Sequence, residues 1–97
     1  MELEKIRNEI LQVGNILSNK TKHIEAYLFG SILTSPKNAN DVDLLILYNS
    51  SEQIDIIKQE IKKLESLIPL HLTYFTYEEE IEFNFISEVK AEIIFKI

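Results

Sequence analysis

The sequence predicts an α/β or α+β fold in which helices flank a small mixed β-sheet. Two hydrophobic patterns alternate along the 97 residues. Spacings of three and four residues are typical of amphipathic helices, and short alternating or continuous apolar runs are typical of strands. The predicted order is helix, strand, loop, strand, helix, strand, helix. No linker, internal repeat or low-complexity segment separates these elements, so we expect residues 1–97 to form a single domain.

The first predicted elements are a helix and a strand. The helix covers residues 3–17, where the apolar positions follow helical spacing: Leu3, Ile6, Ile10, Val13 and Leu17. Polar residues 18–22 end it. Alternating apolar residues then predict a strand that ends directly before Gly30. Pro36, Asn38 and Asn40 predict a loop over the second half of residues 31–40.

The remaining elements follow from two capping patterns and two apolar runs. Residues 42–48 are nearly all apolar, which is typical of a central strand covered on both faces. Ser50 and Gln53 match a capping box before a helix that Pro69 ends. A third strand is predicted over residues 70–75, and Thr76 with Glu79 predicts that a helix begins at Tyr77. We predict that residues 81–97 are also helical, with a break near residues 84–87.

Composition excludes several classes of function. The chain has no cysteine, so it has no disulfide, thiolate zinc site or cysteine nucleophile. A formal net charge of −6 with scattered lysines disfavours nonspecific binding to nucleic acid. A nucleoside triphosphate remains compatible with this charge, because magnesium neutralises much of its own. No apolar run approaches the length of a membrane span and the N-terminal residues are charged, so we expect a cytoplasmic protein without a membrane segment.

Residues suited to phosphate and metal chemistry lie between positions 30 and 43. Gly30 directly follows a predicted strand, where the absence of Cβ permits a sharp turn and a close approach of phosphate. Ser31 adds a hydroxyl and, if a helical turn begins there, free backbone N–H groups, so the pair can cradle an anion. Asp41 and Asp43 are two apart on a predicted strand and point to one face. Paired carboxylates favour hard divalent cations, and two such cations can clamp the oxygens of a nucleotidyl transfer.

Each half of this pattern also has a structural explanation. A Gly-Ser pair after a strand is commonly only a turn, and an Asp-x-Asp sequence is commonly a solvated strand end. The order and spacing of the two halves, and the apolar residues that frame them, favour a functional site.

The stretch Phe29-Gly30-Ser31, a gap of nine residues and Asp41-Val42-Asp43-Leu44 resembles the motif of the minimal nucleotidyltransferases of the DNA polymerase β-like superfamily. The resemblance implies that superfamily's fold, with Gly30 and Ser31 binding triphosphate oxygens. It implies that Asp41 and Asp43 are catalytic ligands of Mg²⁺ or Mn²⁺. The implied reaction transfers a nucleoside monophosphate from a nucleoside triphosphate to a hydroxyl of a protein or small-molecule acceptor. Small members of the family pair with helical HEPN-type proteins in toxin–antitoxin modules, so the resemblance also implies a protein partner.

The sequence departs from this family at the third catalytic position. Active members carry a third carboxylate on the next strand, whereas the nearest positional match here is His71, which we predict as the third catalytic residue. Imidazole is a poor magnesium ligand, but it can accept a proton or bind a softer metal. The alternative for His71 is a polar residue at a strand start. Two functions therefore stay open: an active nucleotidyltransferase, and a catalytically weakened binding module of the same fold that caps a partner.

The last predicted feature is an interaction surface in the C-terminal segment. Residues 81–97 carry more large apolar side chains than a domain of this size is expected to cover, and an exposed apolar patch usually marks an interface. We therefore expect a stable protein partner, of the HEPN type that the resemblance implies, or a homo-oligomer.

Overall fold

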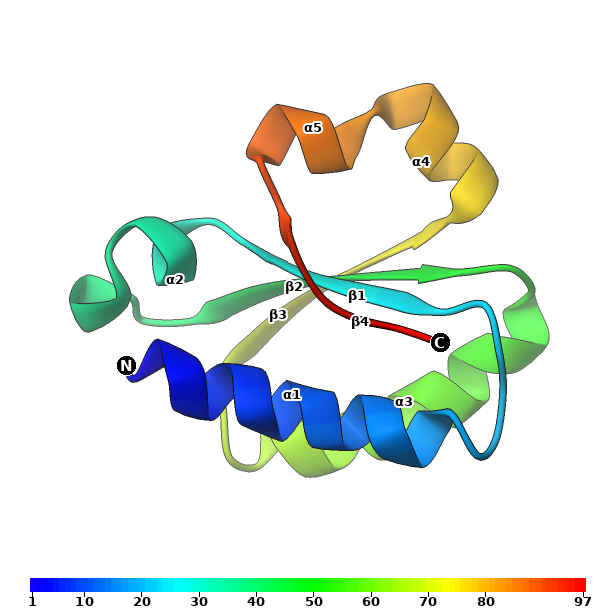
Figure 1. Cartoon of the computed structure of the whole chain (residues 1–97), viewed down its shortest axis with the longest axis horizontal. Coiled ribbons are helices and arrows are strands. Elements are labelled where there is room, and N and C mark those ends of the chain that lie inside the picture. Colours follow the sequence, from blue (N-terminus) through cyan, green and yellow to red (C-terminus); the bar gives the residue numbers. More distant parts are fainter.

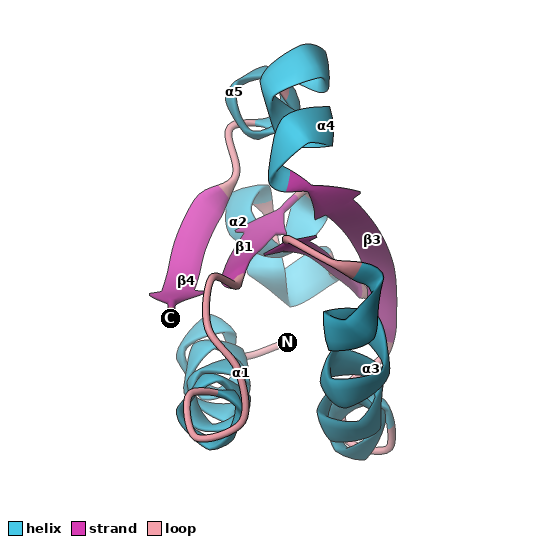
Figure 2. Ribbon diagram, turned by 90° about the vertical axis from the view of Figure 1, so that its right-hand side faces the viewer, coloured by secondary structure: helices cyan, strands magenta, loops and turns pink.

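The computed structural model describes all 97 residues, and its centre is a four-stranded sheet with the strand order β3-β2-β1-β4. Two long helices, α1 and α3, lie beneath one face of this sheet, and the short helices α4 and α5 lie above the other (Figures 1 and 2). The elements follow one another as α1 (Leu3–Leu17), β1 (Glu25–Phe29), α2 (Ser31–Thr34), the 3-10 turn η1 (Pro36–Asn38), β2 (Val42–Tyr48), α3 (Ser51–Glu65), β3 (Leu70–Thr76), α4 (Tyr77–Phe83), α5 (Phe85–Val89) and β4 (Glu92–Lys96).

The sheet is mixed, because β1 pairs antiparallel with β2 and β4, whereas β2 pairs parallel with β3 across the α3 connection. Alternate side chains of a strand point to opposite faces. Leu44 and Ile46 of β2 therefore join the core formed with α1 and α3, and Leu45 and Leu47 are buried on the other face. The prediction of a central strand covered on both faces is confirmed. The core beneath the sheet consists mainly of aliphatic side chains, including Ile10, Leu17, Leu28, Ile57 and Ile61.

Both predicted capping patterns form at helix starts. The Gln53 side chain accepts hydrogen bonds from the backbone N–H groups of Asn49 (2.7 Å) and Ser50 (3.2 Å) at the start of α3. At the start of α4, the Thr76 hydroxyl accepts from the Glu79 N–H, and the Glu79 carboxylate accepts from the Thr76 N–H. These reciprocal bonds satisfy donors that a helix terminus leaves free.

The predicted helix over the C-terminal residues is wrong in its second half. Asn84 and Lys90 adopt left-handed backbone conformations that end α4 and α5, and the chain then forms β4 along β1. A free strand edge supplies hydrogen-bond partners that are distant in sequence, so local periodicity did not reveal them. None of the helices combines the length and the apolar character that a bilayer crossing requires.

A glycine in the middle of α1 allows β4 to pack closely on that helix. A Cβ at Gly14 would lie 2.7 Å from two ring atoms of Phe95, which is only 6% exposed. Real Cβ atoms do not approach other heavy atoms this closely, so either the ring or the helix would have to move. The glycine therefore serves the contact between the first helix and the last strand.

We expect Gly14→Ala to destabilise the protein. Alanine favours a helix over glycine by about 1 kcal/mol, but overpacking a well-filled core costs about 1–3 kcal/mol. We expect the clash to dominate and the free energy of unfolding to fall by about 1 kcal/mol, as measured by urea denaturation. Asn15→Ala, at the exposed neighbouring position, is the matched control and should be neutral or stabilising. An increase in stability for Gly14→Ala would contradict the close packing.

A buried carboxylate joins α3 to the turn that follows α1. Glu60 is 2% exposed and accepts hydrogen bonds from the ammonium groups of Lys20 (2.7 Å) and Lys63 (3.0 Å). These two bonds hold the pKa of the Glu60 carboxyl below its usual range. Because the folded-state pKa is the lower one, the carboxylate stabilises the fold above its unfolded-state pKa. This contribution is lost as the pH falls through the folded-state pKa.

Glu60→Gln should therefore reduce stability at neutral pH and have a progressively smaller effect as the solution is acidified below the ordinary range of glutamate. Urea denaturation of wild type and variant at pH 7 and at successively lower pH measures the difference between them. Asp55→Asn, an exposed position on the same helix, is the control. A wild-type advantage that stays constant down to acid pH would show that the ion pairs with Lys20 and Lys63 do not stabilise the fold.

Candidate functional site

The residues predicted to form the site gather at one end of the sheet, where β1 ends and β2 and β3 begin. Phe29 pairs with Asp43 across the β1–β2 ladder, and Asp43 pairs with His71 across the β2–β3 ladder. Side chains that are directly opposite on neighbouring strands share a face. Since Val42 points into the core beneath the sheet, Asp43 and His71 point to the opposite face, the one that carries α4 and α5.

Gly30 occupies a conformation and a space that only glycine fits. Its φ of 78° and ψ of −152° lie in a region that residues with a side chain rarely adopt. A Cβ built on Gly30 would also lie 2.4 Å from Oδ2 of Asp43. From the sequence, we expect Gly30 to permit a sharp turn and a close approach of phosphate. The structure adds that the Asp43 carboxylate lies directly against the glycine backbone.

Asp43 is held from its other side by His71. The Nδ1 atom of His71 lies 2.9 Å from Oδ1 of Asp43. The Asp43 side chain is 20% exposed and the His71 side chain is 72% exposed, so the pair opens to solvent on the His71 side. A neutral imidazole that donates its Nδ1 proton to Asp43 keeps the Nε2 lone pair available as a proton acceptor. This arrangement can orient a base, because the carboxylate fixes both the tautomer and the direction of the ring.

Ser31 and Asp41 lie beside this group but are not bonded into it. Ser31 follows Gly30 as the first residue of α2 and is exposed, so its hydroxyl is free to meet a ligand. Asp41 is exposed and immediately precedes β2, whose first residue is Val42, so it lies one residue outside the strand in which we predicted it. The structure thus joins Gly30, Asp43 and His71 by direct contacts, and it leaves Asp41 at the entrance to the strand.

The acidic and histidine side chains do not form a complete metal site by themselves. No three Asp, Glu, His or Cys side chains cluster closely enough to hold a metal ion. Magnesium in nucleotide sites usually takes one or two carboxylates and completes its coordination with water and substrate phosphates. Asp43, backed by the cradle at Gly30 that a Cβ would fill, and the nearby Asp41 fit this sparse carboxylate set. They fit a cation that arrives with the triphosphate better than a permanently bound one.

A second polar cluster lies further along the same face. The Tyr27 hydroxyl donates to the Glu25 carboxylate. Burial, reinforced by Glu25, raises the pKa of both Tyr27 and Tyr77 well above the usual range. Both phenols therefore remain protonated and are poor candidates for the base of a transfer reaction. Sequence reasoning missed this cluster, since its members are far apart in sequence and match no motif.

The aromatic residues near the site pack against one another. The rings of Phe29 and Phe85 meet edge to face with centroids 5.1 Å apart, and Phe75 contacts both Phe83 (5.2 Å) and Phe85 (5.3 Å). Rings that pack edge to face against one another are core and contact residues and do not offer a free face for base stacking. Their function in the structure is to hold α4 and α5 over the sheet.

Comparison with family models gives a match over residues 4–96 to the nucleotidyltransferase domain. The chain belongs to the nucleotidyltransferase domain family. The matched range includes every residue predicted for the site and all four strands. Comparisons with curated proteins and with solved structures gave no significant match. Membership of this family assigns nucleotidyl transfer as the general function, and members of the family generally use divalent metals.

Gly30→Ala tests the steric constraint at the centre of the candidate site. The strained backbone should cost about 1–3 kcal/mol of stability, and the new Cβ should displace the Asp43 carboxylate. We expect a lower free energy of unfolding, by urea denaturation, and weaker magnesium-dependent binding of triphosphate, by calorimetry.

The double variant Gly30→Ala/Asp43→Ala separates the two effects in this test. It keeps the backbone strain but removes the contact with the carboxylate. Its stability should therefore exceed the value expected if the two single effects added. Additivity of the two substitutions would show that the Cβ and the carboxylate do not meet.

Proposed function

We propose that the protein transfers a nucleoside monophosphate from a nucleoside triphosphate to a hydroxyl group and releases pyrophosphate. The observation that carries the proposal is the contact of Asp43 with both Gly30 and His71. This contact joins the glycine and a carboxylate of the family motif to His71, a proton acceptor on the neighbouring strand β3. The family supports the general reaction, and the residues of this chain supply the roles proposed for them.

In the proposed reaction, the acceptor oxygen attacks the α-phosphorus of the triphosphate. A new phosphorus–oxygen bond forms as the bond from the α-phosphorus to the oxygen bridging to the β-phosphate breaks, and pyrophosphate leaves. Gly30 and Ser31 lie against the phosphates, and Asp41 and Asp43 are the carboxylates that would hold the cation. When bound, Mg²⁺ or Mn²⁺ supplies positive charge that neutralises the triphosphate and stabilises the reacting oxygens.

His71 is the proposed proton acceptor. With Nδ1 bonded to Asp43, Nε2 receives the proton of the attacking hydroxyl, and the exposed ring then releases it to water. The position of the His71 ring fits this role, since the ring lies next to the Asp43 carboxylate that would bind the cation. The acceptor must accordingly approach from the side of β3, where His71 opens to solvent.

The same residues support a second candidate function. The structure has no cluster of three metal-ligating side chains, and an imidazole occupies the position of the missing acid. A weakly held cation would favour nucleotide binding over turnover. In this alternative the protein is a nucleotidyltransferase-fold binding module that caps a partner protein, and the nucleotide serves as a ligand.

A protein partner is common to both candidate functions. On α4, Ile81 is 83% exposed and Phe83 is 49% exposed, and Ile93 on β4 is 49% exposed. Large apolar side chains at this exposure are typical of interaction surfaces. We propose a cytoplasmic partner of the helical HEPN type, as in a toxin–antitoxin pair, with the enzyme modifying a hydroxyl of that partner.

The decisive test incubates the protein with each α-labelled nucleoside triphosphate, Mg²⁺ or Mn²⁺, and the product of the neighbouring gene as acceptor. We expect covalent label on the acceptor. Asp43→Asn should remove it, and His71→Ala should slow transfer by about 100-fold, the usual contribution of a general base. His71→Asp should raise the rate with Mg²⁺, because it restores the family's third carboxylate. Asp55→Asn, on the far side of the protein from the site, should leave the rate unchanged.

Calorimetry with and without chelator completes this test. Triphosphate binding should need the divalent cation, and Asp41→Asn/Asp43→Asn should remove that dependence. If wild type and His71→Asp both bind triphosphate but label no acceptor, the binding-module function replaces the enzymatic one. If His71→Ala is as fast as wild type, the proton leaves through water and the histidine is only a strand residue.

A further inference from the structure

The two edges of the sheet differ in how they are protected against pairing with another strand. At one edge, β4 carries the exposed residues Glu92 and Lys96, and its pairing with β1 is interrupted by an irregularity at Ala26 and Tyr27. Charges and bulges are the usual means by which proteins block a free edge. At the other edge, β3 runs for seven residues without a Lys, Arg, Asp, Glu or Pro, and its register with β2 is continuous. In Figure 2 no element lies beyond β3.

The free edge of β3 presents backbone groups in a defined alternation. The Val42 N–H donates to the Pro69 carbonyl at 2.8 Å. The backbone hydrogen-bonding groups of Pro69, and of every second residue after it, therefore point toward β2. The N–H and C=O groups of Leu72 and Tyr74 therefore point away from the sheet. These groups can pair with one added strand without disturbing the existing ladder.

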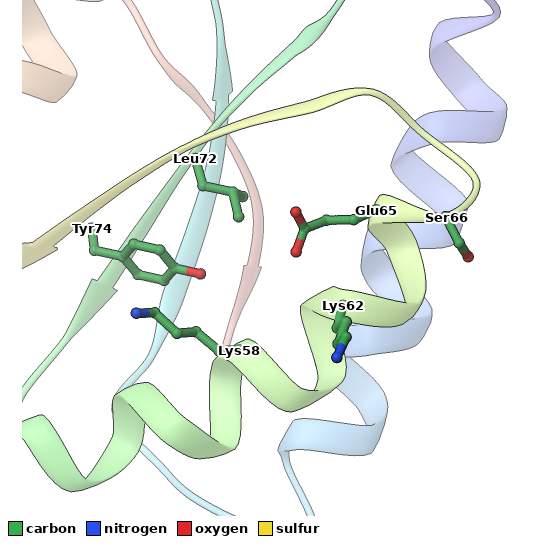
Figure 3. A pocket seen from close by; sticks show the side chains of 6 residues that line it. All are labelled: Lys58, Lys62, Glu65, Ser66, Leu72 and Tyr74. Carbon is green, nitrogen blue, oxygen red and sulfur yellow. The ribbon is translucent and has the colours of Figure 1, made fainter.

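A groove lies beneath this edge, between β3 and α3. It has a volume of about 520 Å³, and Figure 3 shows its lining side chains: Lys58, Lys62, Glu65, Ser66, Leu72 and Tyr74. The Tyr74 hydroxyl is buried and has no hydrogen-bond partner. Buried polar atoms are nearly always paired, so this hydroxyl is suited to an acceptor atom that a ligand brings. Two lysines against one glutamate make the groove locally basic in a chain whose net charge is −6.

On the opposite face, the same edge leads directly to the nucleotidyltransferase site. His71 is 72% exposed and is the β3 neighbour of Asp43. Neighbouring strands lie about 4.8 Å apart, so a strand added to β3 would place a side chain about that far from His71. Because alternate side chains of a strand face opposite ways, one segment can fill the basic groove and present a side chain to the site at the same time.

We propose that the acceptor is a polypeptide segment that docks in extended conformation along the free edge of β3. Its acidic side chains lie in the β3–α3 groove with Lys58 and Lys62, and its hydroxyl-bearing side chain lies beside His71. The role of this hydroxyl as the acceptor rests on the proposed nucleotidyl transfer, whereas docking of the segment is measured without nucleotide.

A second copy of this chain fits the edge less well than an acidic segment. An antiparallel pairing of two β3 strands would place both α3 helices on the same face of a continuous sheet. The lysines of both copies would then line a shared groove and repel one another. An acidic segment instead neutralises Lys58 and Lys62, so charge complementarity selects the segment.

The probe for docking is the fluorescein-labelled peptide Val-Thr-Glu-Tyr-Glu-Thr-Val, which carries acidic side chains on one face and hydroxyls on the other. We expect it to bind the full chain, by fluorescence anisotropy without nucleotide. The double variant Lys58→Glu/Lys62→Glu should weaken binding by about tenfold, because it reverses two partly exposed ion pairs. Lys90→Glu, at the end of α5, carries the same kind of charge change away from the groove and should bind as wild type does.

Two further variants distinguish docking from a merely structural effect. Tyr74→Phe removes the unpaired hydroxyl, so it should weaken peptide binding while leaving the protein as stable as wild type or more so. Methylating alternate backbone amides of the peptide should abolish binding for one set of positions and not for the other, since only one set faces β3. The sensitive set also reports whether the segment runs parallel or antiparallel to β3.

Failure of the peptide to bind, or binding that Lys58→Glu/Lys62→Glu leaves unchanged, overturns the inference. A dimer by light scattering that the peptide cannot compete away would assign the edge to a second copy and also overturn it. If docking fails while label still reaches a free hydroxyl compound such as glycerol, the inference falls and the proposed function stands. If the peptide docks as described and no hydroxyl is ever labelled, the proposed function falls and the docking surface stands.

Discussion

The parallel pairing of β2 with β3 is the interaction on which the site depends. It sets His71 directly opposite Asp43, and the antiparallel pairing of β2 with β1 brings Asp43 to the end of β1 at Gly30. A shift of either register by one residue would turn the paired side chain to the opposite face of the sheet. The α3 crossover makes the parallel pairing possible, and the buried aliphatic residues of α3 and β2 hold it in place. The site is therefore a product of the core beneath it.

Much of this arrangement follows from local sequence signals. Each of these signals determines structure within a few residues of its own position. They are the amphipathic spacing of residues 3–17, the apolar run of β2, and the capping pairs Ser50 with Gln53 and Thr76 with Glu79. The sharp turn at Gly30 could be predicted for the same reason, because this glycine lies between a strand and a polar segment. These signals were sufficient for three of the four strands and for the long helices, whereas His71 was assigned to the site only through the resemblance to the nucleotidyltransferases.

The features that the sequence did not predict depend on contacts between distant segments. The sequence gives no reason for a glycine in the middle of α1. The structure gives it, because the Phe95 ring packs directly on Gly14. The strand character of residues 92–96 depends on β1, which lies far away in sequence. The hydrogen bond that orients His71 depends on strand register, and no spacing within residues 70–76 encodes it. The same-face spacing of Asp41 and Asp43 predicts both residues on one strand, whereas Asp41 lies one residue before β2, since periodicity cannot resolve an element boundary to one residue.

The β1–β4 ladder also bears on the order in which the chain can fold. It joins Glu25 to Lys96 and Leu28 to Glu92, so the long segment from residue 29 to residue 91 must be looped before it forms. The pairings among β1, β2 and β3 close much shorter loops, and the entropy lost on loop closure grows with loop length. The three strands that bring Gly30, Asp43 and His71 together can therefore assemble before β4 pairs with β1. In this order of folding, β4 pairs last. Its contact between Phe95 and Gly14 then joins it to the first helix and adds stability, while the residues of the candidate site are already in position.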